Sequence, residues 1–272
     1  MGTLRGLLTL LLLIALHGNV ATAQHRMPPQ RGVSFVDRFA TFDRAQWFLS
    51  NGWVGGDHSD CTLSGANVVH HPGSVELVLK RQLNKLRQFT CGDLQSQRLY
   101  GYGTYEVRLR SVAAPGVVTT FFTYVHIEPG GQQDEINFTF LGRSPGRAQV
   151  GYVADGQKFP GAEFDLSPDI RTATDYAFEW LPDSIRWFVA GKLAYEVRRT
   201  PGKPFPSKPG KIFVSIWNGR GENMAQWLGK FVDPGTPLAA TIERVSFTEM
   251  GQPCQFPSSV ACYPGANGRR ER

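Results

Sequence analysis

The sequence predicts an all-β protein, most simply a sandwich of antiparallel strands. Short apolar or alternating runs extend from Phe35 to Glu249, separated by Gly, Pro, Asn or Asp. Regular short strands with turn residues between them are typical of β-sandwiches. Strict alternation of polar and apolar side chains over residues 135–140 supports the same fold class. At 272 residues, the chain is long enough for one large domain with a full core.

The expected strands follow one another along the chain. The clearest are Val75–Leu79, Thr104–Leu109, Ile185–Val189, Lys192–Val197 and Lys211–Ile216. Ala190-Gly191 separates two of these runs, which predicts a β-hairpin. We expect no helix longer than one or two turns, and Asp43–Phe48 is the best helix candidate. Trp217-Asn218-Gly219 should end a strand at a turn, where the Trp217 side chain can face a groove.

The N-terminus has the features of a secretion signal over residues 1–23. Arg5 precedes the apolar run Leu7–Leu16, and Ala21-Thr22-Ala23 offers a small-residue cleavage site. The apolar run is too short to span a bilayer, and no later segment is a membrane candidate. We therefore expect a secreted or periplasmic protein. It should have a flexible leader over 24–34, a folded domain over 35–250, and a disulfide-tied loop with a disordered basic tail over 251–272.

Four cysteines fit an oxidising compartment. Their spacing favours the pairs Cys61–Cys91 and Cys254–Cys262, the second closing a short C-terminal loop. No Cys/His spacing indicates zinc. The net charge of +6 comes from scattered residues and the tail, and without clustered aromatic residues in a basic stripe it does not predict nucleic-acid binding. Acidic polysaccharide is a better candidate partner for this charge than nucleic acid, although the default interpretation is a solvated basic surface without a partner. We expect a monomer.

Residues 134–142 carry the clearest sign of chemistry. Glu135, Asn137 and Thr139 alternate with apolar residues, so in a strand their side chains share one face. A retaining glycosidase places two carboxyl groups on such a face, one as nucleophile and one as general acid/base. This chain has one carboxylate there.

Aromatic residues make up 12% of the chain, and several adjoin polar strand faces. Flat aromatic rings stack well on the C–H surface of sugars. Most aromatic residues in a sandwich simply fill the core, so a core role is the default for each of them. Trp217 is the exception because it lies at the end of a strand.

Several motifs together resemble glycoside hydrolase family 16, in particular the bacterial lichenases, over roughly Phe35–Thr248. The resemblance implies a jelly-roll of two curved antiparallel sheets, similar to concanavalin A, whose concave face forms a cleft for a linear glucan. It also supports the Cys61–Cys91 pair and allows a structural calcium ion on the convex side, with no cofactor required. The motifs are Asn51-Gly52-Trp53, Tyr100-Gly101-Tyr102-Gly103-Thr104-Tyr105-Glu106-Val107, Phe121-Phe122-Thr123-Tyr124, Asp134-Glu135-Ile136, Phe140-Leu141-Gly142, Tyr176-Ala177-Phe178-Glu179-Trp180 and Trp217-Asn218-Gly219.

The resemblance also assigns roles within the predicted cleft. Family members carry Glu-Ile-Asp-Ile/Phe-Glu, so Glu135 matches the nucleophile. Asn137 replaces the Asp that assists it, and Thr139 replaces the acid/base Glu. Asp93, where the family has a Glu, is the candidate for a substitute acid. The expected glycan-contacting aromatics are Trp53, Phe122, Tyr124, Tyr152 and Trp217.

Three functions follow as hypotheses. The leading one is an exported protein that recognises β-glucan or a related exopolysaccharide, with hydrolysis lost or strongly reduced because position 139 holds threonine. The alternative is an active endo-β-glucanase or transglycosylase that uses Glu135 as nucleophile and a relocated acid such as Asp93. The third is a structural envelope or matrix protein that keeps the fold without a glycan site.

Overall fold

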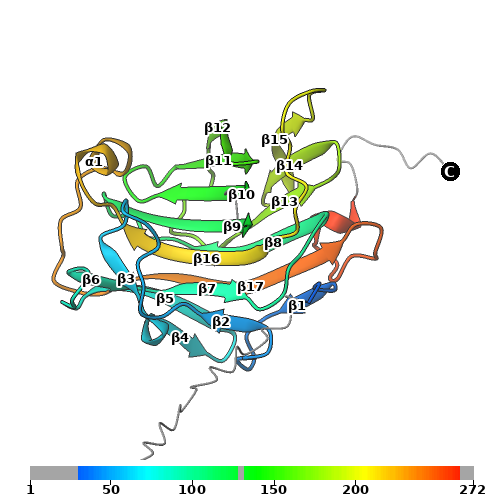
Figure 1. The fold of residues 1–272 in the computed structure, drawn as a ribbon. Coiled ribbons are helices and arrows are strands. Elements are labelled where there is room, and N and C mark those ends of the chain that lie inside the picture. Colours follow the sequence, from blue (N-terminus) through cyan, green and yellow to red (C-terminus); the bar gives the residue numbers. More distant parts are fainter. Residues whose placement is uncertain (1–29, 128–131, 264–272) are drawn as a thin grey trace, which may run out of the picture.

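The computed structural model describes residues 30–127 and 132–263, which form a sandwich of two β-sheets (Figure 1). The predicted signal peptide, leader residues 24–29 and the tail from residue 264 lie outside the described residues. Within the two sheets, neighbouring strands pair antiparallel except β3 with β6. The predicted all-β sandwich is confirmed.

The larger sheet has ten strands. In spatial order it contains β15 (Lys192–Arg198), β14 (Ser184–Val189), β13 (Thr174–Trp180), β8 (Gly103–Arg110), β17 (Leu238–Glu249), β5 (Ser74–Arg81), β6 (Phe89–Cys91) and β3 (Cys61–Leu63), with β1 (Phe35–Asp37) beside β17 and β4 (Val68–His71) beside β5.

The second sheet has seven strands, and it carries the residues of the predicted cleft. Its order is β12 (Gln157–Asp165), β11 (Arg147–Ala154), β10 (Gln132–Leu141), β9 (Val117–Ile127), β16 (Lys211–Asn218), β7 (Asp93–Ser96) and β2 (Trp47–Leu49).

All five strands singled out in the sequence are present, within β5, β8, β14, β15 and β16. The predicted hairpin joins β14 to β15, and both of its turn residues have positive φ, 48° for Ala190 and 76° for Gly191. Positive φ at both positions matches the twist of a two-residue hairpin, and glycine adopts it without a steric penalty.

The prediction of a helix at Asp43–Phe48 is wrong. Asp43 closes a single turn, because its carbonyl oxygen accepts from the backbone N–H groups of Gln46 and Trp47 at 3.2 and 3.0 Å. Trp47 then begins β2, pairs with Ser96 and is fully buried. Cross-strand pairing and burial of the indole outweigh the local helical tendency.

One α-helix, α1 (Glu222–Leu228), occurs in the described part of the chain, together with the 3₁₀ turns η1 (Gly65–Asn67) and η2 (Val260–Cys262). This helix was not predicted from the sequence. Glycines with positive φ flank it, Gly221 at 81° and Gly229 at 80°. Because positive φ does not continue a right-handed helix, these glycines end the helix at both sides after about two turns. Leu228 is fully buried against Val118 and Leu141 of the seven-stranded sheet.

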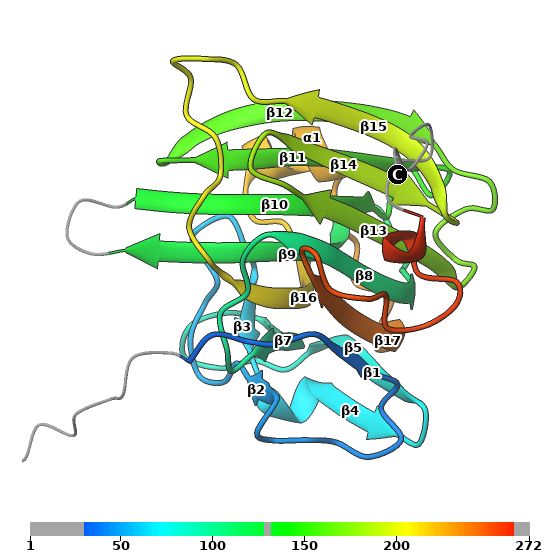
Figure 2. The ribbon, with the colours of Figure 1, turned by 90° about the vertical axis from the view of Figure 1, so that its right-hand side faces the viewer.

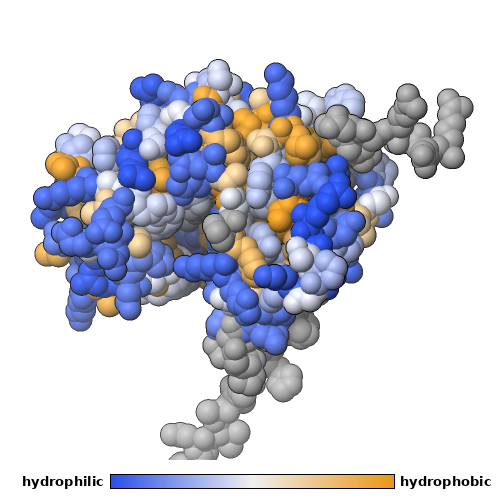
Figure 3. Space-filling view, turned by 90° about the horizontal axis from the view of Figure 1, so that it is seen from above, coloured by the Kyte–Doolittle hydropathy of each residue, from blue (hydrophilic) through white to orange (hydrophobic). Residues whose placement is uncertain are grey.

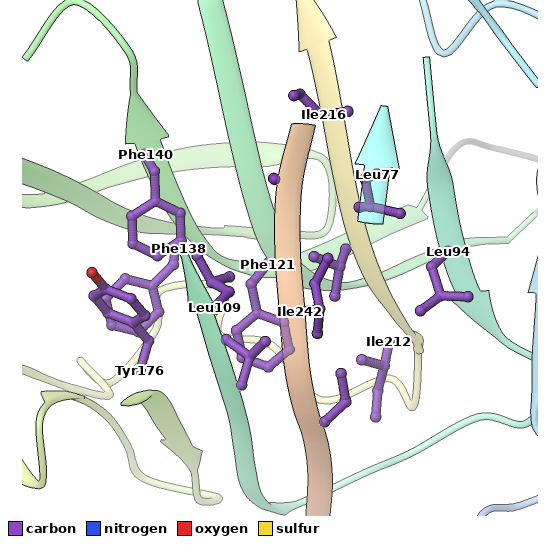
Figure 4. Close-up of a cluster of buried hydrophobic side chains, with 14 of the residues drawn as sticks. Leu77, Leu94, Leu109, Phe121, Phe138, Phe140, Tyr176, Ile212, Ile216 and Ile242 are labelled. Carbon is purple, nitrogen blue, oxygen red and sulfur yellow. The ribbon is translucent and has the colours of Figure 1, made fainter. Parts of the chain in front are cut away.

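The core lies between the two sheets (Figure 4). Phe138 and Phe140 of β10 pack on Tyr176 of β13, with ring centroids 5.6 and 4.5 Å apart. All three side chains are fully buried. Replacing such a phenylalanine with alanine typically costs about 3–5 kcal/mol, so these contacts strongly fix the position of β10.

The folded region begins earlier than residue 35. The backbone N–H of Gly32 donates to Leu99 at 2.7 Å, and Arg31 forms a 2.8 Å ion pair with Glu249. The described end of the predicted leader is therefore held on the domain by strand-like hydrogen bonds.

Both predicted disulfides are present, with Cα–Cα distances of 5.7 Å for Cys61–Cys91 and 5.0 Å for Cys254–Cys262. The C-terminal loop lies over β8 and β13 (Figure 2). Buried Glu106 of β8 holds this loop by accepting from the Ser259 hydroxyl at 2.5 Å and the Val260 N–H at 3.0 Å.

Seen from above, hydrophilic residues cover most of the visible surface, and hydrophobic residues form separate patches between them (Figure 3). Among the residues that the structure describes, no helix has the length and hydrophobicity needed to cross a membrane.

Candidate functional site

The predicted site residues of β10 share one side of the strand. Ile136 and Phe138 are fully buried in the core, so Glu135, Asn137 and Thr139 project from the opposite side of the sheet. We call this side of the seven-stranded sheet the outer face. Direct cross-strand partners lie on the same side, so the register identifies three rows of side chains. The rows are Glu135–Tyr124–Lys211, Asn137–Phe122–Phe213–Gln95 and Thr139–Thr120–Ser215–Asp93.

Glu135 lies partly buried in the first row. The Asn137 side-chain amide donates to its carboxylate at 2.8 Å. Burial raises the pKa of Glu135 above its ordinary value, opposed by hydrogen bonds from Asn137 and Gln133 and by the charge of Lys158. A carboxylate at position 139 would raise the pKa of Glu135 further, and Thr139 carries none. Burial of the Glu135 carboxyl group is the largest cause, and its pKa is therefore raised.

Thr139 lies four residues further along, in the third row, and is only 7% exposed. Its register partners are Gln149 on β11 and Thr120 on β9. Ser215 on β16 is the next residue in this row. Its hydroxyl and that of Thr120 share a 2.7 Å hydrogen bond. Hydroxyl and amide groups therefore surround the position where the resemblance predicts a carboxylic acid. None of these groups is an acid near neutral pH.

Asp93 is in the same row as Thr139 but three strands away, which corresponds to about 14 Å between Cα atoms. It is 6% exposed and accepts a very short hydrogen bond from the Ser50 hydroxyl. Burial raises the pKa of Asp93 to about 6, with the Ser50 hydrogen bond acting in the opposite direction. Its pKa suits a proton donor, but retaining hydrolysis needs carboxyl groups about 5–5.5 Å apart, and its distance from Glu135 does not meet this.

A second carboxylate of this row, Glu163 on β12, was not considered in the sequence analysis. It is the register partner of Gln149, whose amide donates to it at 2.8 Å. Arg147 forms a 2.7 Å ion pair with it. These contacts engage Glu163, and it lies two strand spacings from Thr139, about 10 Å.

Aromatic rings cover the middle of the outer face. Phe122 stacks on Phe213 with centroids 4.9 Å apart, and Tyr124 meets the same ring edge-on at 6.1 Å. Trp53, 42% exposed, stacks on Phe48 at 6.1 Å near the β2 side of the sheet. Three of the five predicted aromatic contacts are thus partly exposed beside Glu135 or at the margin of its face. Flat, partly exposed rings are suitable surfaces for sugar stacking.

Trp217 lies at the end of β16, as predicted, and has neighbours that sequence reasoning missed. The ring of His58 meets it edge-on at 4.9 Å, and the ring of Trp227 from α1 lies 6.3 Å away. Trp227 donates from its indole nitrogen to Gln149 at 3.0 Å. Burial and the charge of Lys158 lower the pKa of His58, while Asp57 opposes them. Nothing local in the sequence places His58 or Trp227 beside β16, because both come from separate segments.

Tyr152 is not on the outer face, contrary to the prediction. Its register partner on β10 is the core residue Ile136, whereas Gly151 pairs with Asn137. Tyr152 instead stacks on Phe159 at 4.8 Å and packs against Phe205 at 5.6 Å. Because side chains alternate along a strand, moving an aromatic residue by one position places its ring on the opposite side of the sheet.

Calcium remains a prediction without an assigned site. Among residues 30–127 and 132–263, no three His, Cys, Asp or Glu side chains converge as a metal cluster. Calcium prefers six to eight oxygen ligands, typically including carboxylates, so these side chains do not form the usual cage.

Several known proteins are similar to this chain in sequence and in structure. Residues 55–232 match the family described as Glycosyl hydrolases family 16. The chain is 36% identical over 232 residues to the endo-1,3-1,4-beta-glycanase ExoK of Rhizobium meliloti (strain 1021), covering 84% of each chain. It is 32% identical over 244 residues to a beta-glucanase of Bacillus licheniformis, covering 88% of this chain and 96% of that protein. A solved structure of the Bacillus licheniformis beta-glucanase superposes with a TM-score of 0.74 at 33% identity, covering 81% of this chain and 100% of the other.

Proposed function

Because the chain belongs to glycosyl hydrolase family 16, we propose that it recognises a β-linked glucan or a related exopolysaccharide on its outer face. In this proposal it hydrolyses that glycan very slowly or not at all. The observation that carries the proposal is Thr139, a buried hydroxyl where the acid/base carboxyl group would be. The aromatic surface of the outer face supports glycan recognition, since Phe122 and Tyr124 remain partly exposed near Glu135. Trp217 is also partly exposed, at the far end of β16.

The chemical reason concerns the leaving group. Cleaving a glycosidic bond in a natural glycan requires a proton on the departing oxygen, and the hydroxyl of Thr139 cannot supply it near neutral pH. General acid/base assistance is worth about 10²–10⁴-fold in rate. Glu135 can still act as a nucleophile toward a substrate whose leaving group needs no proton.

The same proposal includes export to the periplasm or the medium. The N-terminal signal features and two disulfides support it, because disulfides persist in oxidising compartments.

A binding titration tests recognition. We would titrate the protein with mixed-linkage β-glucan, a β-1,3-glucan and an acidic exopolysaccharide, with an α-linked glucan as control, and follow Trp fluorescence and heat. Binding to a β-linked glycan but not to the α-linked one is the expected result. No measurable affinity for any β-linked glycan would favour the structural-protein alternative.

An aryl β-glycoside with a good leaving group tests the chemistry separately. We expect slow release of the aryl group by the wild type and none by Glu135→Gln, together with negligible cleavage of unactivated glucan. Cleavage of natural glucan at rates typical of enzymes, about 1–10³ s⁻¹, would contradict the proposed loss of hydrolysis.

An active hydrolase or transglycosylase is the second candidate, and the raised pKa of Asp93, about 6, favours it. Its distance from Glu135 in the sheet register is unfavourable. Loss of glucan cleavage in Asp93→Asn, in a wild type that does cleave it, would support this alternative.

A further inference from the structure

A row of charged residues lies on the other side of the molecule. Asp175, Arg108 and Arg244 are in register across β13, β8 and β17. Their neighbour on β8, Leu109, is fully buried in the core, so the row faces away from it. The register shifts between Ile242 and Arg244, which inserts Glu243 into the same surface. Such bulges redirect side chains and are frequent near functional sites.

The C-terminal disulfide loop covers one side of this row. The guanidinium of Arg244 lies 4.1 Å from the ring centroid of Phe256, and that of Arg38 lies 5.8 Å from the same ring. Between the sheet and the loop is a surface pocket of about 490 Å³. Its lining residues are Arg38, Gly73, Arg108, Asp175, Glu243, Arg244 and Ser258.

The two carboxylates of the pocket are already engaged. Arg108 donates to Glu243 at 2.9 Å and to Asp175 at 3.2 Å. Arg244 donates to the other oxygen of Asp175 at 2.5 Å. Three arginines and two carboxylates line the pocket, which gives the lining one net positive charge. The buried carboxyl group of Glu106 interacts with Arg244 from below the pocket and offsets part of that charge when ionised.

Three groups that line the pocket have hydrogen-bond donors without a partner. The Arg244 side chain is only 6% exposed, and its buried Nε has no hydrogen-bond partner within the described part of the chain. Exposed Arg38 has the Phe256 ring as its contact and no ion pair with a described residue. The exposed Ser258 hydroxyl has no hydrogen bond to residues 30–127 or 132–263. A guanidinium can only donate hydrogen bonds, so these groups suit an acceptor with negative charge.

We propose that this pocket binds the carboxylate or phosphate group of a small ligand, with Arg38 and Ser258 as its direct donors. The buried Arg244 supplies positive charge beneath the ligand. A pocket of about 490 Å³ is larger than the anionic group itself and has room for an attached sugar ring. The site faces away from Glu135 and does not depend on the function proposed for the outer face.

Isothermal titration of the full chain at fixed ionic strength tests this site. The probes are glucuronate, glucose 6-phosphate, inorganic phosphate and glucose. We expect the anions to bind with a stoichiometry of one and glucose not to bind. Arg38→Ala should weaken anion binding by roughly ten-fold or more, because it removes hydrogen bonds to a charged group. Ser258→Ala should weaken it to a smaller extent.

Matched variants locate the binding. Arg44→Ala removes the same charge from another exposed arginine, which does not line the pocket, and should leave the affinity unchanged. Glu135→Gln should also leave it unchanged, since the outer face is on the other sheet. Binding of phosphate as tightly as glucose 6-phosphate would assign recognition to the anionic group alone. The proposal fails if no anion binds, if glucose binds equally well, or if Arg38→Ala and Arg44→Ala have the same effect.

Discussion

Asn137 donates a 2.8 Å hydrogen bond to the carboxylate of Glu135. The bond keeps Glu135 oriented on the outer face, but an amide cannot accept a proton from the carboxylate or repel its charge. The carboxylate at the predicted nucleophile position is therefore held in place, while positions 137 and 139 of β10 carry no ionisable side chain.

The double variant Asn137→Asp/Thr139→Glu should gain activity on unactivated β-glucan. A glutamic acid at position 139 can protonate the leaving oxygen, which is worth about 10²–10⁴-fold. Reducing-sugar release measures the gain. The same double change in a Glu135→Gln background should give no activity, and a thermal unfolding curve checks that the larger side chain is accommodated. An unchanged rate in a folded variant would show that other parts of the face are also unfit for cleavage.

Removing a tyrosine hydroxyl should affect glycan binding only on the outer face. Tyr124→Phe is expected to weaken binding of the best β-linked glycan by about two- to ten-fold, the worth of one hydrogen bond. Tyr152→Phe is the matched control, because Tyr152 packs on Phe159 and Phe205 on the other side of the sheet. Titration calorimetry compares the two. Equal losses in both variants would contradict the assigned faces.

Stability should fall as pH rises through the titration of Asp93. Its pKa in the folded protein is about 6, above the ordinary value of 3.8, so between these values the folded state binds more protons than the unfolded state. The cost of ionising the buried carboxyl is absent below about pH 4 and nearly complete above about pH 7, where it amounts to about 3 kcal/mol. Urea unfolding of wild type and Asp93→Asn over this range measures it. As pH rises, the unfolding free energy of Asp93→Asn should increase relative to that of the wild type.

The two disulfides should contribute unequally to stability. Cys61 and Cys91 are 30 residues apart, whereas Cys254 and Cys262 are 8 apart. The longer loop restricts the unfolded chain more, so replacing the first pair with alanines should cost about 3.5 kcal/mol and the second about 2.5 kcal/mol. Denaturant unfolding without reductant gives both values. A larger loss from the second pair would indicate that docking of the Phe256 loop matters more than loop entropy.

Local patterns in the sequence were sufficient for much of the fold. Alternation along residues 135–140 predicted that Glu135, Asn137 and Thr139 share a face, because the two-residue repeat of a strand is a property of the backbone alone. The Ala190-Gly191 hairpin was similarly local. The Asp43–Phe48 helix failed because long-range pairing of Trp47 with Ser96 determines the conformation there.

By itself, the sequence determined which side chains alternate within a strand, that a threonine stands at position 139 where the family resemblance predicts a glutamate, and which cysteines pair. Only the tertiary structure decided the relations between strands. The register of β11 on β10 turns Tyr152 away from the outer face, and strand order separates Asp93 from Glu135. Likewise, a bulge on β17 aligns Arg244 with Arg108 and Asp175. Register and strand order depend on contacts between residues far apart in the chain, so no short stretch of sequence specifies them.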